Sequence, residues 1–198
     1  MKSLKNVILI GMPGSGKSTV GVVLAKVLGY RFIDSDLEIQ SQEGKRLPEL
    51  IEEFGTEGFL DIEARVNASI EAERCVVATG GSVVYRDSAM QHLKEIGTVV
   101  YLKLTCEELE ERLGDLRCRG VALQEGQTLQ SLYEERIPLY EKYADITVDE
   151  TNMSVEETME QVVLRYQSRI FPDVQRMDPV WQYFSRDSIH RLYGLQHL

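Results

Sequence analysis

The chain has 198 residues, of which 43% are hydrophobic, and its formal net charge at pH 7 is −10. This length and apolar content predict one globular domain with a substantial core, and no apolar run approaches the roughly 18 residues that a membrane-spanning helix needs. The acidic balance argues against nucleic acid as a partner, because phosphate backbones require a basic face.

The first predicted strand, at 6–10, runs directly into a glycine-rich loop and a predicted helix at 15–28. The loop matches the pattern G-x-x-x-x-G-K-[ST] in full. Its glycines let backbone N–H groups point at phosphate oxygens, and the helix aims its positive dipole end at the same place. Lys17 would reach the β- and γ-phosphates, and Ser18 would ligate Mg²⁺. We therefore expect ATP and Mg²⁺ to bind here, with these nucleotide-binding residues: Gly11, Gly14, Ser15, Gly16, Lys17, Ser18 and Thr19.

Two carboxylates follow the second predicted strand, at 31–33. Asp34 and Asp36 stand two residues apart at the strand end and should face the phosphate loop. One can support Mg²⁺ while the other accepts the proton of an incoming hydroxyl. The alternative is that one of them only caps the next helix.

The remaining predicted elements alternate short apolar runs with helical patterns. Such alternation indicates βαβ units and an α/β fold with a five-stranded parallel sheet flanked by helices. The further strands are predicted at 74–78, 98–102 and 145–148, and the further helices at 48–54, 58–73, 88–96, 106–113, 129–143 and 154–167.

The loop after the third predicted strand reads Thr79-Gly80-Gly81-Ser82. Ligands of parallel sheets gather at the carboxyl ends of the strands, and paired glycines let a bound molecule approach the backbone closely. An ordinary sharp turn is the alternative. In the helix at 129–143, Pro138 should bend the chain and aim Arg136 into the cleft, where it suits a carboxylate or phosphate. A surface salt bridge with Glu134 or Glu135 is the competing interpretation.

Two segments lack these patterns. The stretch 114–128 is aperiodic, carries Arg119, and has the length of a mobile lid. The segment 171–198 is too aromatic for a simple disordered tail, so we expect it to fold against the body or a partner subunit. This gives a kinase domain at 1–170 followed by a C-terminal extension.

Several motifs, in order along the chain, resemble the shikimate kinases, which are small P-loop relatives of the nucleoside monophosphate kinases. The motifs span 7–148 and include Gly11–Gly21, Phe32–Asp36, Gly58-Phe59 with Glu63, Ala78–Gly81, Val99–Leu102, Arg112, Arg119, Arg136 with Tyr140, and Tyr143–Asp145. The resemblance implies that Asp34 supports the Mg²⁺ network and that Asp36 contacts the substrate hydroxyls. It also implies that Arg112 flanks the adenine, that Arg119 covers the phosphates, and that Arg136 binds the substrate carboxylate.

The departures from this family lie where the substrate is selected. The family's carboxylate-binding arginine is replaced by Leu60, its third glycine by Ser82, and its lid Arg-Pro-Leu-Leu by a run that begins Arg119-Gly120. Losing a bidentate arginine should cost about 2–5 kcal/mol of affinity for a buried carboxylate. Arg65 is a candidate replacement, and Asp61 and Glu63 are left without an arginine partner.

Together these features predict a kinase that transfers the γ-phosphoryl group in line to a hydroxyl of a small carboxylate-bearing metabolite. Shikimate is the leading acceptor. The alternative acceptors are a zwitterionic alcohol such as homoserine, or gluconate. A hypothesis of a different functional class is a nucleotide-binding module without catalytic activity. The catalytic residues are Lys17, Asp36 and Arg119, and the substrate-binding residues are Asp36, Gly80, Gly81, Ser82 and Arg136. Scattered cysteines without C-x-x-C spacing indicate a reduced, cytoplasmic protein, which we expect to be a monomer or a weak homo-oligomer.

Overall fold

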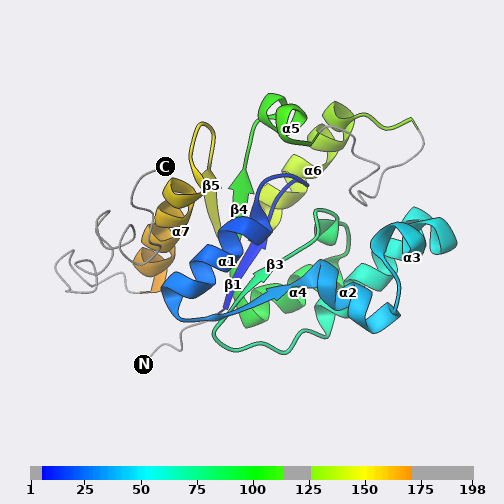
Figure 1. Ribbon diagram of the computed structural model, residues 1–198, viewed down its shortest axis with the longest axis horizontal. Coiled ribbons are helices and arrows are strands. Elements are labelled where there is room, and N and C mark those ends of the chain that lie inside the picture. The colour runs from blue at the N-terminus through cyan, green and yellow to red at the C-terminus, as the bar shows by residue number, and fades with distance from the viewer. Residues whose placement is uncertain (1–5, 114–125, 171–198) are drawn as a thin grey trace, which may run out of the picture. The chain divides into compact units, whose positions relative to one another are not determined.

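The computed structural model describes residues 6–113 and 126–170, and its strands and helices alternate along the chain (Figure 1). In order, the elements are β1 (Asn6–Ile10), α1 (Lys17–Leu28), β2 (Arg31–Asp34), α2 (Ser35–Glu43), α3 (Leu47–Ala68), β3 (Cys75–Ala78), the short 3₁₀ helix η1 (Val83–Tyr85), α4 (Asp87–Ile96), β4 (Gly97–Lys103), α5 (Cys106–Leu113), α6 (Leu129–Tyr143), β5 (Ile146–Asp149) and α7 (Val155–Ile170).

The five strands form one parallel sheet in the order β2-β3-β1-β4-β5, which confirms the predicted fold class. The central strand β1 is buried along its whole length, as its unbroken apolar run Val7–Ile10 indicates for a strand covered on both faces. The chain leaves β1 between neighbours β3 and β4, and ligands of open parallel sheets bind at such a switch in strand order.

Helices cover both faces of this sheet. Ile8 and Ile10 of β1 belong to a core cluster that is completed by side chains of α4, α5 and α6. On the other face, Gly21 of α1 lies so close to Leu9 and Phe32 that a Cβ at this position would stand 2.7 Å from the Phe32 ring. The two covered faces hold the carboxyl ends of the strands in fixed relative positions.

The structure differs from the predicted elements mainly between β2 and β3. The segment Ser35–Glu43 is a helix that the pattern did not indicate, and the helices predicted at 48–54 and 58–73 are one element, α3, interrupted at Gly55 with φ 69°. This helix also ends at Ala68, earlier than predicted. Pro48 lies in its first turn, as expected.

One compact unit comprises Met1–Tyr166, and the second comprises Gln167–Leu198. The predicted extension at 171–198, and most of the predicted lid at 114–128 with its Arg119, lie outside the described residues. Within the described ranges no helix is long and apolar enough to cross a membrane.

Candidate active site

The phosphate loop joins β1 to α1 and turns through two glycines with left-handed backbone. Gly14 has φ 84° and Gly16, the residue before the helix, has φ 79°, a region that residues with a Cβ adopt at a cost. The glycines thus allow the first free N–H groups of α1 to open toward the loop, where the helix dipole favours an anion.

Lys17 lies at the floor of this loop. Its Nζ donates hydrogen bonds to the carbonyl oxygens of Gly11 and Met12, at 2.9 and 2.8 Å. Burial lowers the pKa of Lys17 to about 8, against the opposing attraction of Asp36 and Glu150. The ammonium is therefore largely charged at neutral pH and is held where phosphate oxygens are expected.

Ser18 and Asp34 meet across the loop. The Ser18 hydroxyl donates to Asp34 Oδ2 at 2.7 Å, and Asp34 Oδ1 accepts the backbone N–H of Asp36 at 3.0 Å. Asp34 therefore caps α2, the role that the competing interpretation gave to one of these two residues. The cap leaves its other oxygen beside Ser18, so a hydroxyl and a carboxylate converge as an Mg²⁺ site requires.

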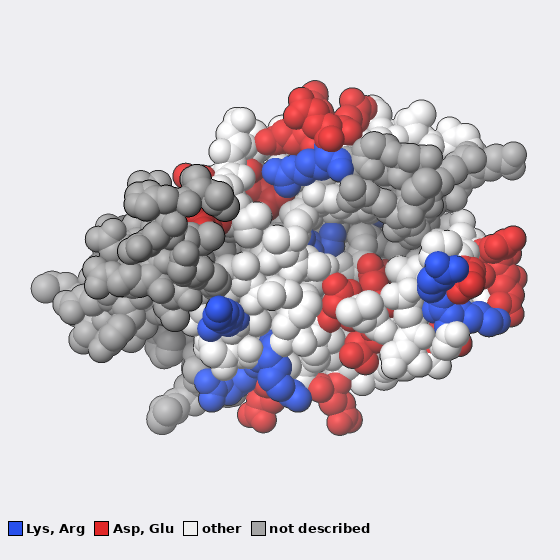
Figure 2. Space-filling view, viewed as in Figure 1, with Lys and Arg blue, Asp and Glu red and all other residues white. Residues whose placement is uncertain are grey.

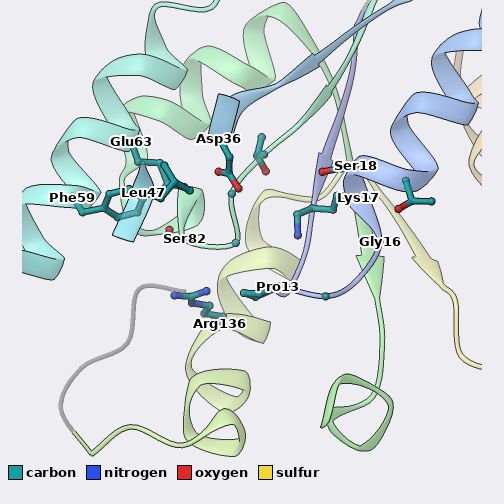
Figure 3. A pocket seen from close by; sticks show the side chains of 15 residues that line it. Pro13, Gly16, Lys17, Ser18, Asp36, Leu47, Phe59, Glu63, Ser82 and Arg136 are labelled. Atoms are coloured by element: carbon teal, nitrogen blue, oxygen red, sulfur yellow. The ribbon is translucent and has the colours of Figure 1, made fainter. Parts of the chain in front are cut away.

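Asp36 points into the pocket from the first turn of α2 (Figure 3). Burial and the neighbouring charge of Asp34 raise its pKa to about 6, and Lys17 opposes the rise. A carboxylate with a pKa near 6 is a better proton acceptor at neutral pH than an ordinary aspartate, yet it remains mostly ionised. This is the chemistry that a general base needs.

Arg136 enters the pocket from α6 and is 1% exposed. Its Nε donates to the Tyr85 hydroxyl at 3.0 Å, and its guanidinium lies over the Tyr85 ring at 5.0 Å from the centroid. The next turn of α6 is fixed by Tyr140, whose hydroxyl donates to the Gly81 carbonyl at 2.6 Å. The guanidinium is thus held against the Gly80–Gly81 turn, away from the surface salt bridge that was the competing interpretation.

Of these residues, Lys17, Ser18, Asp36 and Arg136 line one pocket of about 360 Å³ at the carboxyl ends of the strands. The hollow near the middle of the space-filling view has basic atoms on its floor, and acidic side chains gather over α5 above it (Figure 2). The lining residues are Pro13, Gly14, Gly16, Lys17, Ser18, Thr19, Asp36, Leu47, Phe59, Glu63, Thr79, Gly80, Gly81, Ser82 and Arg136.

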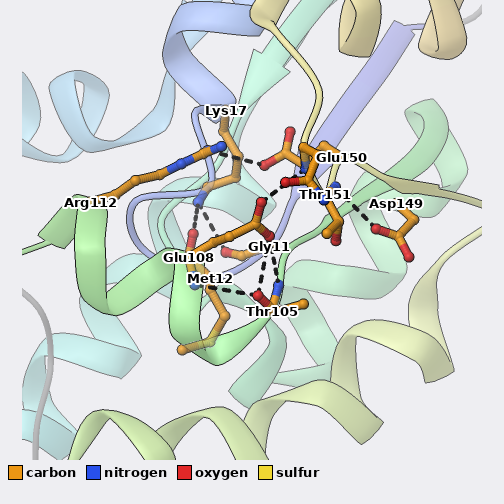
Figure 4. A network of polar contacts seen from close by, with 10 residues as sticks. Gly11, Met12, Lys17, Thr105, Glu108, Arg112, Asp149, Glu150 and Thr151 are labelled. Carbon is orange, nitrogen blue, oxygen red and sulfur yellow. Dashed lines mark hydrogen bonds and ion pairs between the residues drawn. The ribbon is translucent and has the colours of Figure 1, made fainter.

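Arg112 belongs to a separate polar network beside the phosphate loop (Figure 4). Its Nη1 lies 3.6 Å from Glu150, a nearly buried residue directly after β5. Glu108 of α5 accepts the N–H of Asn152 at 2.9 Å, so α5 and the loop after β5 are joined. Arg112 is therefore positioned next to the phosphate loop, although it does not line the pocket itself.

The structure places three residues of the substrate side, and it contradicts the expectation that Asp61 lacks an arginine partner. Asp61 is not without an arginine, because Arg86 Nε lies 2.9 Å from its Oδ1 and the side chain is 72% exposed. Arg65 does not replace the missing arginine, since it pairs with Glu43 on the surface. Leu60 is buried but does not line the pocket. Glu63 alone of the two acids faces the cavity.

Sequence reasoning left Glu63, Leu47 and Phe59 out of the site residues. Phe59 and Glu63 are four residues apart and so share one face of α3, which was the available signal. Glu150 was also missed, because an acidic residue after a predicted strand has no pattern that indicates burial.

The strand order, the phosphate loop and the pocket define a P-loop kinase of the nucleoside-monophosphate-kinase type. The shikimate kinase family model matches residues 13–167. The chain is 36% identical to shikimate kinase of Thermodesulfovibrio yellowstonii, over 83% of this chain and 96% of that one. It is 40% identical to shikimate kinase of Thiobacillus denitrificans, over 78% and 86%.

Among solved structures, shikimate kinase from Acinetobacter baumannii in complex with shikimate aligns with a TM-score of 0.75 and 32% identity, covering 88% of this chain and 97% of that one. The chain belongs to the shikimate kinase family. It is an ATP-dependent kinase that phosphorylates a hydroxyl group.

Proposed function

We propose that this enzyme transfers the γ-phosphoryl group of ATP to shikimate, giving shikimate 3-phosphate and ADP. The observation that carries the proposal is the pocket itself, which brings Lys17, Asp36 and Arg136 from three separate elements around one cavity. Shikimate has a hydroxyl to be phosphorylated and a carboxylate, and the cavity has a base for the first and a guanidinium for the second.

Asp36 is the proposed general base. It accepts the proton of the substrate hydroxyl while the oxygen forms a bond to the γ-phosphorus and the bond to the leaving ADP oxygen breaks. Its pKa of about 6 leaves it ionised at neutral pH. Held beside Lys17, the same carboxylate orients the hydroxyl toward the transferred group.

The proposed phosphate cradle is formed by the loop residues Gly11, Gly14, Ser15, Gly16, Lys17 and Thr19. We place Arg112 beside the adenine of ATP and Arg119 over its phosphates. Lys17 supplies positive charge to the β- and γ-phosphates. Ser18 and Asp34 are the residues that would hold Mg²⁺, which neutralises charge on the phosphates. Their 2.7 Å hydrogen bond supports this assignment, because it brings the Ser18 hydroxyl and an Asp34 carboxylate oxygen together.

Arg136 is the proposed contact for the substrate carboxylate, with Gly80, Gly81 and Ser82 lining the same side of the pocket. Because its Nε is engaged by Tyr85, the guanidinium is fixed in orientation before substrate binds, which reduces the entropy lost on binding. With Leu60 in place of the family's usual arginine, Arg136 carries this contact without that second guanidinium.

The kinase domain is assigned to 1–170 with a lid at about 114–128, and 171–198 is assigned as an extension that packs on the body or a partner. We further propose a cytoplasmic enzyme, a monomer or weak homo-oligomer, that does not bind nucleic acid. The acidic net charge of −10 supports the last point.

An acceptor panel tests the proposed function. The full-length protein is incubated with ATP and Mg²⁺ together with shikimate, homoserine or gluconate, and the products are resolved by ³¹P NMR. We expect shikimate 3-phosphate and a kcat/KM for shikimate at least about 100-fold above that for the other two acceptors, a difference of about 2.7 kcal/mol. Preferential phosphorylation of homoserine or gluconate would overturn the assignment of shikimate.

A further inference from the structure

Glu150 is a buried carboxylate that the proposed phosphoryl transfer does not use. It follows β5 directly and is 2% exposed, yet its Oε1 has no hydrogen-bond partner among the described residues. Burying an ionisable side chain without a hydrogen-bond donor costs stability, and natural chains accept such a cost mainly at functional sites. The charge of Glu150 therefore has a use other than holding the fold together.

The backbone fixes Glu150 at the carboxyl end of the sheet. Its N–H donates to the Lys103 carbonyl of β4 at 2.9 Å, and its own carbonyl accepts the N–H of Met153 at 2.9 Å. The side chain extends from there toward α5 and the phosphate loop (Figure 4). Burial lowers the pKa of Lys17, and the negative charges of Asp36 and Glu150 oppose that change. The Glu150 carboxylate is therefore close enough to act on the loop.

The cation beside Glu150 is Arg112, whose Nη1 lies 3.6 Å from Glu150 Oε1, an ion pair too long for a hydrogen bond. On a helix an arginine can pair with an acid four residues earlier, which here is Glu108. Both oxygens of Glu108 are engaged, Oε1 by the N–H of Asn152 and Oε2 by the hydroxyl of Thr105. The Arg112 side chain reaches off α5 to the end of β5. A long side chain that is 40% exposed has many rotamers, and the buried charge favours those beside the phosphate loop.

We propose that Glu150 is a positioning residue for the nucleotide: its buried charge holds the Arg112 guanidinium beside the phosphate loop, where it flanks the adenine of ATP. This inference rests on the proposed function, which places Arg112 beside the adenine. The phosphate loop then binds one end of the nucleotide and Arg112 the other, and Glu150 fixes the spacing between them. Because Arg112 is held in place before ATP arrives, less conformational entropy is lost on binding.

The test combines a double-mutant cycle with two ligands. Calorimetry on the full-length protein gives the Kd of wild type, Glu150→Gln, Arg112→Ala and the double variant for ATP and for inorganic tripolyphosphate, each with Mg²⁺. Glu150→Gln should raise the Kd for ATP at least about fivefold, within the range of coupling between contacting residues. It should add nothing in the Arg112→Ala background. Its Kd for tripolyphosphate should not rise, because that ligand has no base and the substitution removes a negative charge near an anion site.

The melting temperature separates positioning from damage to the fold. Glu150→Gln replaces a buried charge by a neutral side chain of nearly the same shape, so the variant should melt at or above the wild-type temperature although ATP binds more weakly. Glu107→Gln is the matched control, because it removes one negative charge from the exposed first turn of α5, the helix of Arg112. This control should leave the Kd for ATP within about twofold, as expected for an exposed charge.

Four results would each overturn the positioning role of Glu150 and leave the proposed function intact. They are a rise of the ATP Kd below about fivefold in Glu150→Gln, a loss that adds to that of Arg112→Ala, an equal loss for tripolyphosphate, and a lower melting temperature. An unchanged ATP Kd in Arg112→Ala would remove Arg112 from the nucleotide site, and this inference with it. Failure of the wild type to phosphorylate shikimate would overturn the proposed acceptor, while these dissociation constants, measured without acceptor, would still decide the role of Glu150.

Discussion

Asp36 gives the reaction a definite pH dependence. Its pKa is raised to about 6 by burial and by Asp34, and only the ionised carboxylate can accept the proton of the acceptor hydroxyl. Activity is therefore full above this pKa and is lost as the pH falls through it. We expect kcat/KM for shikimate, measured from pH 5 to 8 at saturating ATP, to fall on the acid side with an apparent pKa near 6.

The variant Glu63→Gln tests whether the acid limb of the pH profile arises from Asp36 or from Glu63, the second buried carboxylate in the pocket. The variant should retain the acid limb with a reduced overall level. An acid limb that disappears in Glu63→Gln, or one centred below about pH 4.5 in the wild type, would contradict the assignment of the limb to Asp36.

Glu63 also makes stability depend on pH. Its folded pKa of about 7 lies above the ordinary value of 4.5, so the folded state binds this proton more tightly than the unfolded chain. The protonated Glu63 side chain therefore contributes to the free energy of unfolding. This contribution is fully present below about pH 4.5 and is lost as the pH rises through 7. A shift of this size corresponds to roughly 3 kcal/mol.

Glu63→Gln removes the cost of burying an ionised carboxylate at high pH. We therefore expect the variant to have a higher free energy of unfolding than wild type at pH 8, by roughly 2–4 kcal/mol, and a much smaller difference at pH 5. Urea denaturation at both pH values measures it. A variant that is less stable than wild type at pH 8 would show that the charged side chain stabilises the fold.

At the scale of whole elements, the sequence was a good guide wherever burial leaves a pattern. The strands were predicted within a residue or two. The signal was strongest for β1 and β3, which are mostly apolar and buried along their whole length, whereas β2 has no fully buried residue. The helix α2 was missed because only Ser35 and Ile39 of its nine residues are buried, which is too little for a periodic apolar stripe.

In the site, too, residues set by local sequence patterns were predicted, and contacts between residues distant in sequence were not. Lys17 and Asp36 are placed by a motif and a strand end, which are local features of the sequence. The partners of Asp61 and Arg65 depend on side chains that are distant in sequence, Arg86 and Glu43, and no local pattern encodes such pairs. The orientation of Glu63 into the pocket likewise follows from how α3 packs, which only the three-dimensional structure gives.

The turn after β3 must stay free of side chains for the two carboxylates to converge. Gly80→Ala would place a methyl group 2.3 Å from Glu63 and 2.9 Å from Asp36, closer than real contacts, so at least one carboxylate must move. We expect kcat/KM for shikimate to fall at least about 100-fold, in line with the sensitivity of catalysis to misplaced groups, while ATP affinity changes little.

Gly29→Ala is the control for this substitution. Gly29 has φ +66° and open space around its Cβ position, so the change costs stability through backbone strain without touching the pocket. Wild-type kcat/KM is expected for Gly29→Ala below its melting temperature. A Gly80→Ala enzyme with normal kinetics would contradict the placement of the carboxylates.

At the scale of the whole molecule, every proposed site residue falls in the unit Met1–Tyr166. A chain that ends at residue 170 retains all of them and the whole of α7. We therefore expect it to keep kcat/KM for shikimate within about threefold of the full-length value, a difference of less than 1 kcal/mol. Loss of activity in a truncated chain that still melts cooperatively would assign a catalytic contribution to 171–198.

The most direct measurement compares wild type and Asp36→Asn in a single turnover with γ-labelled ATP and shikimate, with ATP affinity determined for both. Asparagine has nearly the same shape but cannot take the proton, so transfer should slow at least about 100-fold while the Kd for ATP stays within about twofold. Transfer at the wild-type rate in Asp36→Asn would contradict the central claim that this carboxylate holds and deprotonates the hydroxyl that receives the phosphoryl group.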